Sequence, residues 1–111
     1  MRIELSGEHL DITSAIRQYV EEKFGSLEHL LSRFEAEGET VAYVDVARST
    51  AHHRHGNVFR VVATLHLPGK TFRVEHSDVD ARIAVDVAKD TLKRDIIRHK
   101  DMLGSKNITR K

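Results

Sequence analysis

The strongest constraint on the fold is a pair of alternating segments joined by a tight turn. Residues 58–67 alternate apolar and polar side chains with a period of two, as in a strand with one buried face. Pro68-Gly69 follows. Proline presets φ at the first central position of a turn, and glycine accepts the positive φ of a type II turn. Residues 70–77 alternate again, with Phe72 on the apolar face. The sequence therefore predicts an antiparallel hairpin with one apolar face, which other elements of the fold must bury.

The first amphipathic segment can bury part of that apolar face. Apolar residues recur every three or four positions from Ile16 to Phe34, after a candidate N-cap oxygen at Thr13. This spacing predicts one helix of about five turns that stops before Gly38. Gly25 in its middle costs roughly 1 kcal/mol relative to alanine. We expect a bend there rather than an end.

A second amphipathic segment fills the C-terminal third. It opens at Asp78 or Asp80, which offer N-cap oxygens, and we expect Gly104 to end it. Its predicted inner stripe is formed by Ala81, Val85, Ala88, Leu92, Ile96 and His99. Residues 104–111 are polar and basic without periodicity, which predicts a flexible tail.

Residues 2–7 and 41–48 also alternate and predict two further strands. The order is then β-α-β-β-β-α, an α+β fold with a four-stranded mixed sheet and two helices on one face. The first two strands can lie parallel through a right-handed crossover, and the other pairs antiparallel. The opposite sheet face can remain open to water. A chain of 111 residues suits one domain, which we place at 1–103.

Composition removes several classes of function. There is no cysteine, which excludes disulfides, thiolate metal sites and cysteine nucleophiles. No glycine-rich phosphate loop, nucleophile elbow or zinc-peptidase motif occurs, so neither an enzyme nor a cofactor is expected. No apolar run suits a membrane span and the first ten residues lack a signal-peptide core. Without cysteine staples, the cytoplasm is the expected compartment.

A histidine cluster leaves one alternative open. His52, His53 and His55 place three imidazoles within four residues, and His66 or His76 could add a fourth metal ligand. The cluster lies in a predicted loop without a matching second cluster, so we expect a solvated loop and no metal site. A metal-binding protein remains the alternative.

The charge is distributed unevenly along the chain. The net charge is +1, but residues 1–40 carry nine acidic and four basic side chains, whereas residues 79–111 carry nine basic and five acidic ones. On the last helix four cations border the predicted inner stripe: Arg82, Lys89, Lys93 and Lys100. Arg94 and Arg98 lie on another exposed side. Such a ridge can track a nucleic-acid backbone. Lysine and arginine stems covering an apolar edge explain it equally well.

At this point the chain resembles the short ribosome hibernation-promoting factors, also called ribosome-associated inhibitors or sigma-54 modulation proteins. The likeness spans roughly residues 1–103. The stretches that carry it are Ile3-Glu4-Leu5-Ser6-Gly7, Asp11-Ile12-Thr13, Ala15-Ile16-Arg17, Val20 to Phe24, Leu27-Glu28, Pro68-Gly69, Asp80, Ala84-Val85-Asp86, Leu92 with Arg94, and Arg98-His99-Lys100. Residues 52–61 are similar to a basic, histidine-containing hairpin in one branch of the family.

The resemblance implies the same β-α-β-β-β-α order, in a fold related in shape to the double-stranded-RNA-binding domain. It implies binding to the small ribosomal subunit and its rRNA in the intersubunit cleft, where family members occupy the tRNA and mRNA sites and inhibit translation under stress. No membrane or small-molecule partner is implied. Carried over by position, the RNA-binding residues are Arg17, Lys23, Arg94, Arg98 and Lys100.

The chain departs from the family at four positions. Ser26, Thr91 and Met102 stand where many relatives have lysine, and Arg82 replaces a common tyrosine. We expect Arg82 and Lys93 to compensate. The dimerisation domain of the long members is missing, so a monomer is expected off the ribosome. Three competing functions remain: a general double-stranded-RNA binder, the metal-binding protein already described, and a module that acts on a transcription factor.

Overall fold

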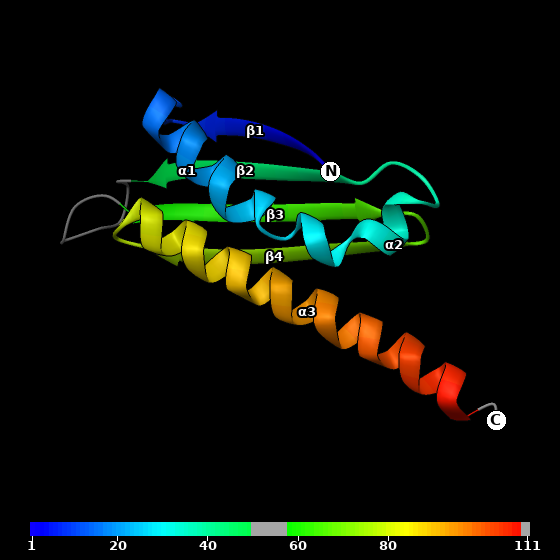
Figure 1. Cartoon of the computed structure of the whole chain (residues 1–111). Coiled ribbons are helices and arrows are strands. Elements are labelled where there is room, and N and C mark those ends of the chain that lie inside the picture. Colours follow the sequence, from blue (N-terminus) through cyan, green and yellow to red (C-terminus); the bar gives the residue numbers. More distant parts are fainter. Residues whose placement is uncertain (50–57, 110–111) are drawn as a thin grey trace.

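The four predicted strands and the two main helices are present in the structure, a computed structural model (Figure 1). It describes the backbone of residues 1–49 and 58–109 and the side chains of residues 1–49 and 58–103. The elements are β1 (Arg2–Glu8), α1 (Ser14–Gly25), the short 3-10 helix η1 (Glu28–Leu30), α2 (Ser32–Glu35), β2 (Val41–Ser49), β3 (Val58–Leu67), β4 (Lys70–Asp78) and α3 (Ala81–Thr109).

The sheet has the order β1-β2-β3-β4. β1 runs parallel to β2, and the other two pairs are antiparallel, which confirms the predicted mixed sheet. Leu67 pairs with Lys70 at the β3–β4 turn, where Gly69 takes a φ of 78°. This positive φ is the conformation that glycine adopts without steric cost. The predicted hairpin is therefore confirmed.

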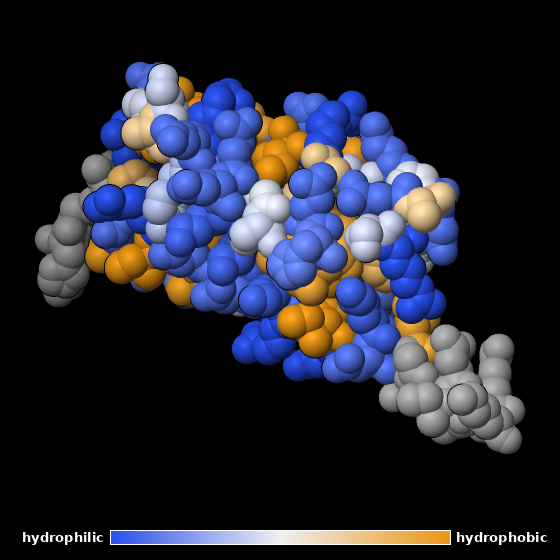
Figure 2. Space-filling model, in the orientation of Figure 1, coloured by the Kyte–Doolittle hydropathy of each residue, from blue (hydrophilic) through white to orange (hydrophobic). Residues whose placement is uncertain are grey.

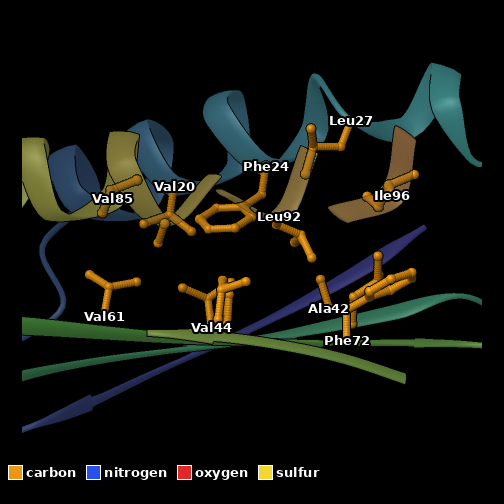
Figure 3. Packing of buried hydrophobic residues seen from close by; sticks show 14 of the residues in the cluster. Val20, Phe24, Leu27, Ala42, Val44, Val61, Phe72, Val85, Leu92 and Ile96 are labelled. Atoms are coloured by element: carbon orange, nitrogen blue, oxygen red, sulfur yellow. The ribbon is translucent and has the colours of Figure 1, made fainter. Parts of the chain in front are cut away.

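The core lies between the sheet and the helices that cover one of its faces (Figure 3). Alternate side chains of β2, β3 and β4 point inward, among them Val44, Val61 and Phe72. The predicted inner stripe of α3 is buried at Val85, Ala88, Leu92 and Ile96 and half-buried at its two ends. At the far end, the His99 ring packs against the rings of Phe34 and Phe72 at centroid distances of 6.0 and 5.7 Å.

The prediction of a single helix from Ile16 to Phe34 is wrong. α1 ends at Gly25, and the Ser26 hydroxyl donates to the Lys23 carbonyl oxygen at 2.6 Å, a local bond that competes with helix continuation. Two short turns follow, η1 and α2. Their apolar side chains Leu27, Leu31 and Phe34 are nevertheless buried. The apolar spacing therefore predicted the buried side chains correctly, although the backbone leaves the line of α1 after Gly25 and turns towards β2 (Figure 1).

The expected end of the last helix at Gly104 is also wrong, because α3 continues to Thr109. Glycine weakens a helix by about 1 kcal/mol but does not forbid helical backbone angles. The start agrees with the second of the two expected positions, since Asp80 accepts the Arg82 backbone N–H at 2.8 Å. Within the described residues, no helix has both the length and the apolar character needed to cross a bilayer.

Candidate nucleic-acid interface

Helices α1 and α3 lie on the same face of the sheet, and their facing edges form what we call the seam (Figure 1). The Tyr19 hydroxyl of α1 donates to Asp86 Oδ1 of α3 at 2.7 Å. Lys23 Nζ lies 3.9 Å from the same oxygen and 5.4 Å from the centre of the Tyr19 ring. Further along α3, Lys100 Nζ donates to the carbonyl oxygen of Leu30, in η1, at 3.0 Å. Polar contacts therefore hold α3 to α1 at the seam and to η1 beyond the end of α1.

Asp86 is the central anion of the seam. Its hydrogen bond with Tyr19, followed by burial of the phenol, raises the pKa of Tyr19 to about 12. Tyr19 and Lys23 are one helical turn apart on α1 and therefore lie on the same side of the helix. Asp86 can for this reason contact both side chains. The sequence placed Asp86 in one of the stretches that resemble the family, and it did not single out Tyr19. The available signal was a tyrosine at the border of an apolar stripe, one turn before a lysine.

Five of the eight predicted RNA-binding cations border the seam: Lys23, Arg82, Lys89, Lys93 and Lys100. They differ in how strongly the protein already holds them. Lys89 is only 19% exposed and pairs with Asp90 at 2.7 Å, whereas Lys23 pairs with Asp86 and Lys100 with a carbonyl. Arg82 and Lys93 are exposed and make no ion pair within the described residues. Within the described residues, Arg82 and Lys93 are thus the two ridge cations whose side chains make neither an ion pair nor a hydrogen bond.

The other three predicted cations do not lie on the seam. Arg98 follows Lys89 by nine positions, which puts it on the opposite side of α3, and Arg94 lies about 140° from Lys89. Arg17 lies about 120° around α1 from Lys23. All three are exposed. The eight predicted residues therefore fall into five cations on the seam and three on other sides of α1 and α3. One straight nucleic-acid backbone would not contact all eight.

The open face of the sheet is a less suitable site for phosphate. Glu75 accepts Arg60 Nε at 2.7 Å and lies 3.4 Å from Arg73 Nη2. The hydrogen bond from Arg60, ahead of its charge and that of Arg73, lowers the pKa of the Glu75 carboxyl. Glu75 thus offsets one of the two arginine charges and holds both side chains. Figure 2 shows the helix-covered side, where the surface over α1 and α3 is mostly hydrophilic with apolar residues scattered between.

The metal alternative receives no support from the described part of the chain. No group of three or more histidine or carboxylate side chains within residues 1–49 and 58–103 could hold an ion. His52, His53 and His55 lie outside the described residues. His66 instead contacts the Thr71 hydroxyl at 3.1 Å, and His76 lies 3.8 Å from Asp78 Oδ2.

Fold and seam together define a small α+β domain whose helix pair presents cations on one face. Residues 3–103 match the model of the family described as sigma 54 modulation protein / S30EA ribosomal protein. The chain belongs to this family, which confirms the resemblance inferred from the sequence.

Two curated relatives bear related names. The chain is 34% identical over 103 residues to the ribosome hibernation promoting factor of Azotobacter vinelandii, covering 91% of this chain and 84% of the relative. It is 30% identical over 110 residues to the ribosome hibernation promotion factor of Staphylococcus aureus (strain COL), covering 99% of this chain but 54% of that relative.

Solved structures agree on the fold. The N-terminal domain of Thermus thermophilus Protein Y is 35% identical and superposes with a TM-score of 0.73, covering 89% of this chain and 99% of that one. A ribosomal subunit interface protein from Coxiella burnetii gives a TM-score of 0.71 at 22% identity, covering 91% and 99% of the two chains. At that identity the second likeness concerns the fold alone. The predicted α+β class is confirmed.

Proposed function

We propose that this chain is a ribosome hibernation factor that binds the small ribosomal subunit in the cytoplasm and occupies its decoding cleft. Family membership and the names of the relatives support ribosome binding. The observation that carries the choice of surface is the seam, where two helices fixed by Tyr19 and Asp86 present exposed cations on one side. Ribosomal RNA in a cleft offers the complementary phosphates.

The proposed mechanism is steric rather than catalytic. A rigid domain fills the space that tRNA and mRNA need, phosphate contacts supply affinity, and the shape of the cleft supplies specificity. Because Tyr19 and Lys23 are tied to α3 through Asp86, the two helices approach the RNA as one unit, and little ordering entropy is lost on binding.

The structure changes how the expected compensation at Arg82 and Lys93 would operate. Thr91 and Lys93 are two positions apart and so project about 160° from one another around α3. Lys93 therefore cannot replace a lysine at position 91 in the same phosphate contact. Arg82 and Lys93 would add contacts on the seam while the side of α3 that carries Thr91 loses one. We propose that the total number of phosphate contacts is retained and their placement is shifted.

Sedimentation tests this function. The purified chain is centrifuged with ribosomes and with separated small subunits at low and moderate salt. We expect co-sedimentation with the small subunit at one copy per particle and displacement by tRNA. The same gradients reveal any ribosome dimers.

Plain RNA duplex and large subunits serve as controls. Duplex binding as tight as small-subunit binding would favour a general double-stranded-RNA binder. Absence of small-subunit binding at both salt concentrations would contradict the proposal.

A further inference from the structure

An apolar hollow opens where the first half of α1 passes the beginning of α3, above the end of β2. Its volume is about 440 Å³, which falls within the roughly 300–1,000 Å³ of small-ligand pockets. The walls are mostly carbon, contributed by Ile16 and Tyr19 of α1, Val46 of β2 and Val85 of α3. Ala81 lies at the start of α3 and leaves the space that a larger side chain would fill. The core packing does not use this volume.

The edge of the hollow carries one cation and one anion, Arg82 and Asp80. Arg82 contributes to its lining, is exposed, and makes no ion pair among the described residues. Lys23 lies 5.4 Å from the centre of the Tyr19 ring, on the same seam. Asp80 also lines the hollow, but one of its carboxylate oxygens is used as the N-cap of α3. An apolar floor beside an unpaired guanidinium complements a ligand with a flat apolar part and an anionic part.

The Tyr19 ring is held in place before any ligand arrives. Its hydroxyl is bonded to Asp86 at 2.7 Å, so the phenol cannot turn into the hollow and close it. The ring and the aliphatic walls therefore form a preformed surface. Unpaired bases of RNA are commonly recognised by stacking on aromatic side chains, whereas the bases of a duplex are already stacked and inaccessible.

We propose that the hollow receives one unpaired nucleobase of the RNA bound along the seam, with Arg82 contacting the phosphate of that nucleotide. This inference rests on the proposed function and specifies the kind of RNA that the seam prefers. A base contact would favour rRNA segments with an extruded base over plain duplex, which phosphate contacts alone cannot do.

Filling the hollow without changing the charge tests the proposal. Ala81→Leu and Ala15→Leu each place a larger side chain against the lining, and leucine is a good helix former. Ala15 is exposed, so this second variant keeps its fold if the first does not. Gln18→Leu adds the same side chain on α1 at an exposed position outside the lining and serves as the control.

We expect both filled variants to bind small subunits about 5- to 150-fold more weakly, the range for one base-stacking contact. Their salt dependence should flatten by at most one phosphate contact, that of Arg82 with the same nucleotide. Gln18→Leu should bind as the wild type does. If the wild type binds small subunits and both filled variants bind equally well, the nucleobase site is overturned while the proposed function stands. Loss of more than one phosphate contact from the salt dependence of the filled variants would also overturn it, because the weaker binding would then come from phosphate contacts elsewhere.

A ligand titration separates this inference from the proposed function. The four ribonucleoside monophosphates and inorganic phosphate are added to the isolated chain, and the methyl NMR signals of Val46 and Val85 are followed. At least one nucleotide should shift both signals in the wild type but not in Ala15→Leu, and phosphate alone should shift neither. Shifts with a nucleotide when ribosome binding fails would keep the base site and reject the proposed function. No shift with any nucleotide, or equal shifts with phosphate, would reject the base site.

Discussion

Replacing Arg82 and Lys93 together by alanine is expected to weaken small-subunit binding and to flatten its dependence on salt. Both side chains are exposed on the seam side of α3, and neither makes an ion pair within the described residues. Each can neutralise a phosphate without first breaking a contact inside the protein. Every phosphate neutralised in this way releases counterions, so the loss of two contacts changes the salt dependence as well as the affinity.

The size of the effect follows from the number of predicted cations whose side chains have no partner within the described residues. These are Arg17, Arg82, Lys93, Arg94 and Arg98, since Lys23 and Lys89 pair with carboxylates and Lys100 donates to the Leu30 carbonyl oxygen. With one phosphate each, on separate RNA segments because three of the five cations lie off the seam, the slope of log K against log salt is about −3.5 to −4.5 for five contacts and about −2.1 to −2.7 for three. Between about 50 and about 200 mM salt, the wild type should lose about 130- to 500-fold in affinity and the double variant about 20- to 40-fold.

A matched control is available in the same chain. Arg33→Ala with Lys70→Ala also removes one arginine and one lysine, both exposed and without an ion pair in the described part of the chain, from α2 and from the start of β4. Sedimentation at four or more salt concentrations gives the slope for each protein. The control should retain the wild-type slope. Equal slopes for the seam variant and the wild type, with a flatter slope for the control, would refute the assignment of the seam as the phosphate-binding surface.

Three further predictions concern stability. Leu92→Ala opens a cavity at a fully buried site between α3 and the sheet and should lower the free energy of unfolding by about 2–5 kcal/mol in urea titrations, whereas an unchanged midpoint would contradict the packing. Because the pKa of Tyr19 is raised from 10.0 to about 12 by Asp86, its bond stabilises the fold below pH 10 and is lost as pH rises towards 12; Tyr19→Phe should lack this loss in thermal melts across that range. The hydrogen bond from the N-terminal ammonium of Met1 lowers the pKa of Glu35 from 4.5. The wild type should therefore lose stability as pH falls below 4.5, and Glu35→Gln should lose less. An equal loss in both proteins would contradict the Met1–Glu35 pair.

Much of the candidate site could be located from the sequence because helical spacing depends only on position along one element. Arg82, Lys89 and Lys93 were expected on one side of the last helix, and burial of its inner stripe places them there. What each cation can do could not be predicted in this way. Lys89 has its own acidic neighbour, and Lys23 is paired across the seam with a residue of another helix. Ion pairs of the second kind depend on which elements pack together.

The carried-over residues show the same division. Arg17 and Lys23 were both carried over by position from the family and both lie on the first helix, but the contacts of Lys23 with Asp86 and Tyr19 put only Lys23 on the seam. Tyr19 and Asp86 are 67 positions apart, and no local pattern joins them. The hollow beside them is formed by residues from α1, β2 and α3, so it exists only after all three have packed.

The hairpin at Pro68-Gly69, the inner stripe of α3 and the order of the four strands and two main helices could be predicted from the sequence. These features follow from local periodicity, since a segment with one buried face shows its period wherever it packs. The tertiary structure alone decided that the first helix ends at Gly25 while Leu27 and Leu31 stay buried, because an apolar spacing of three and four is satisfied equally by one long helix or by short turns on the same sheet. It also decided which cations remain available to a partner, because that depends on the anions that folding brings beside them.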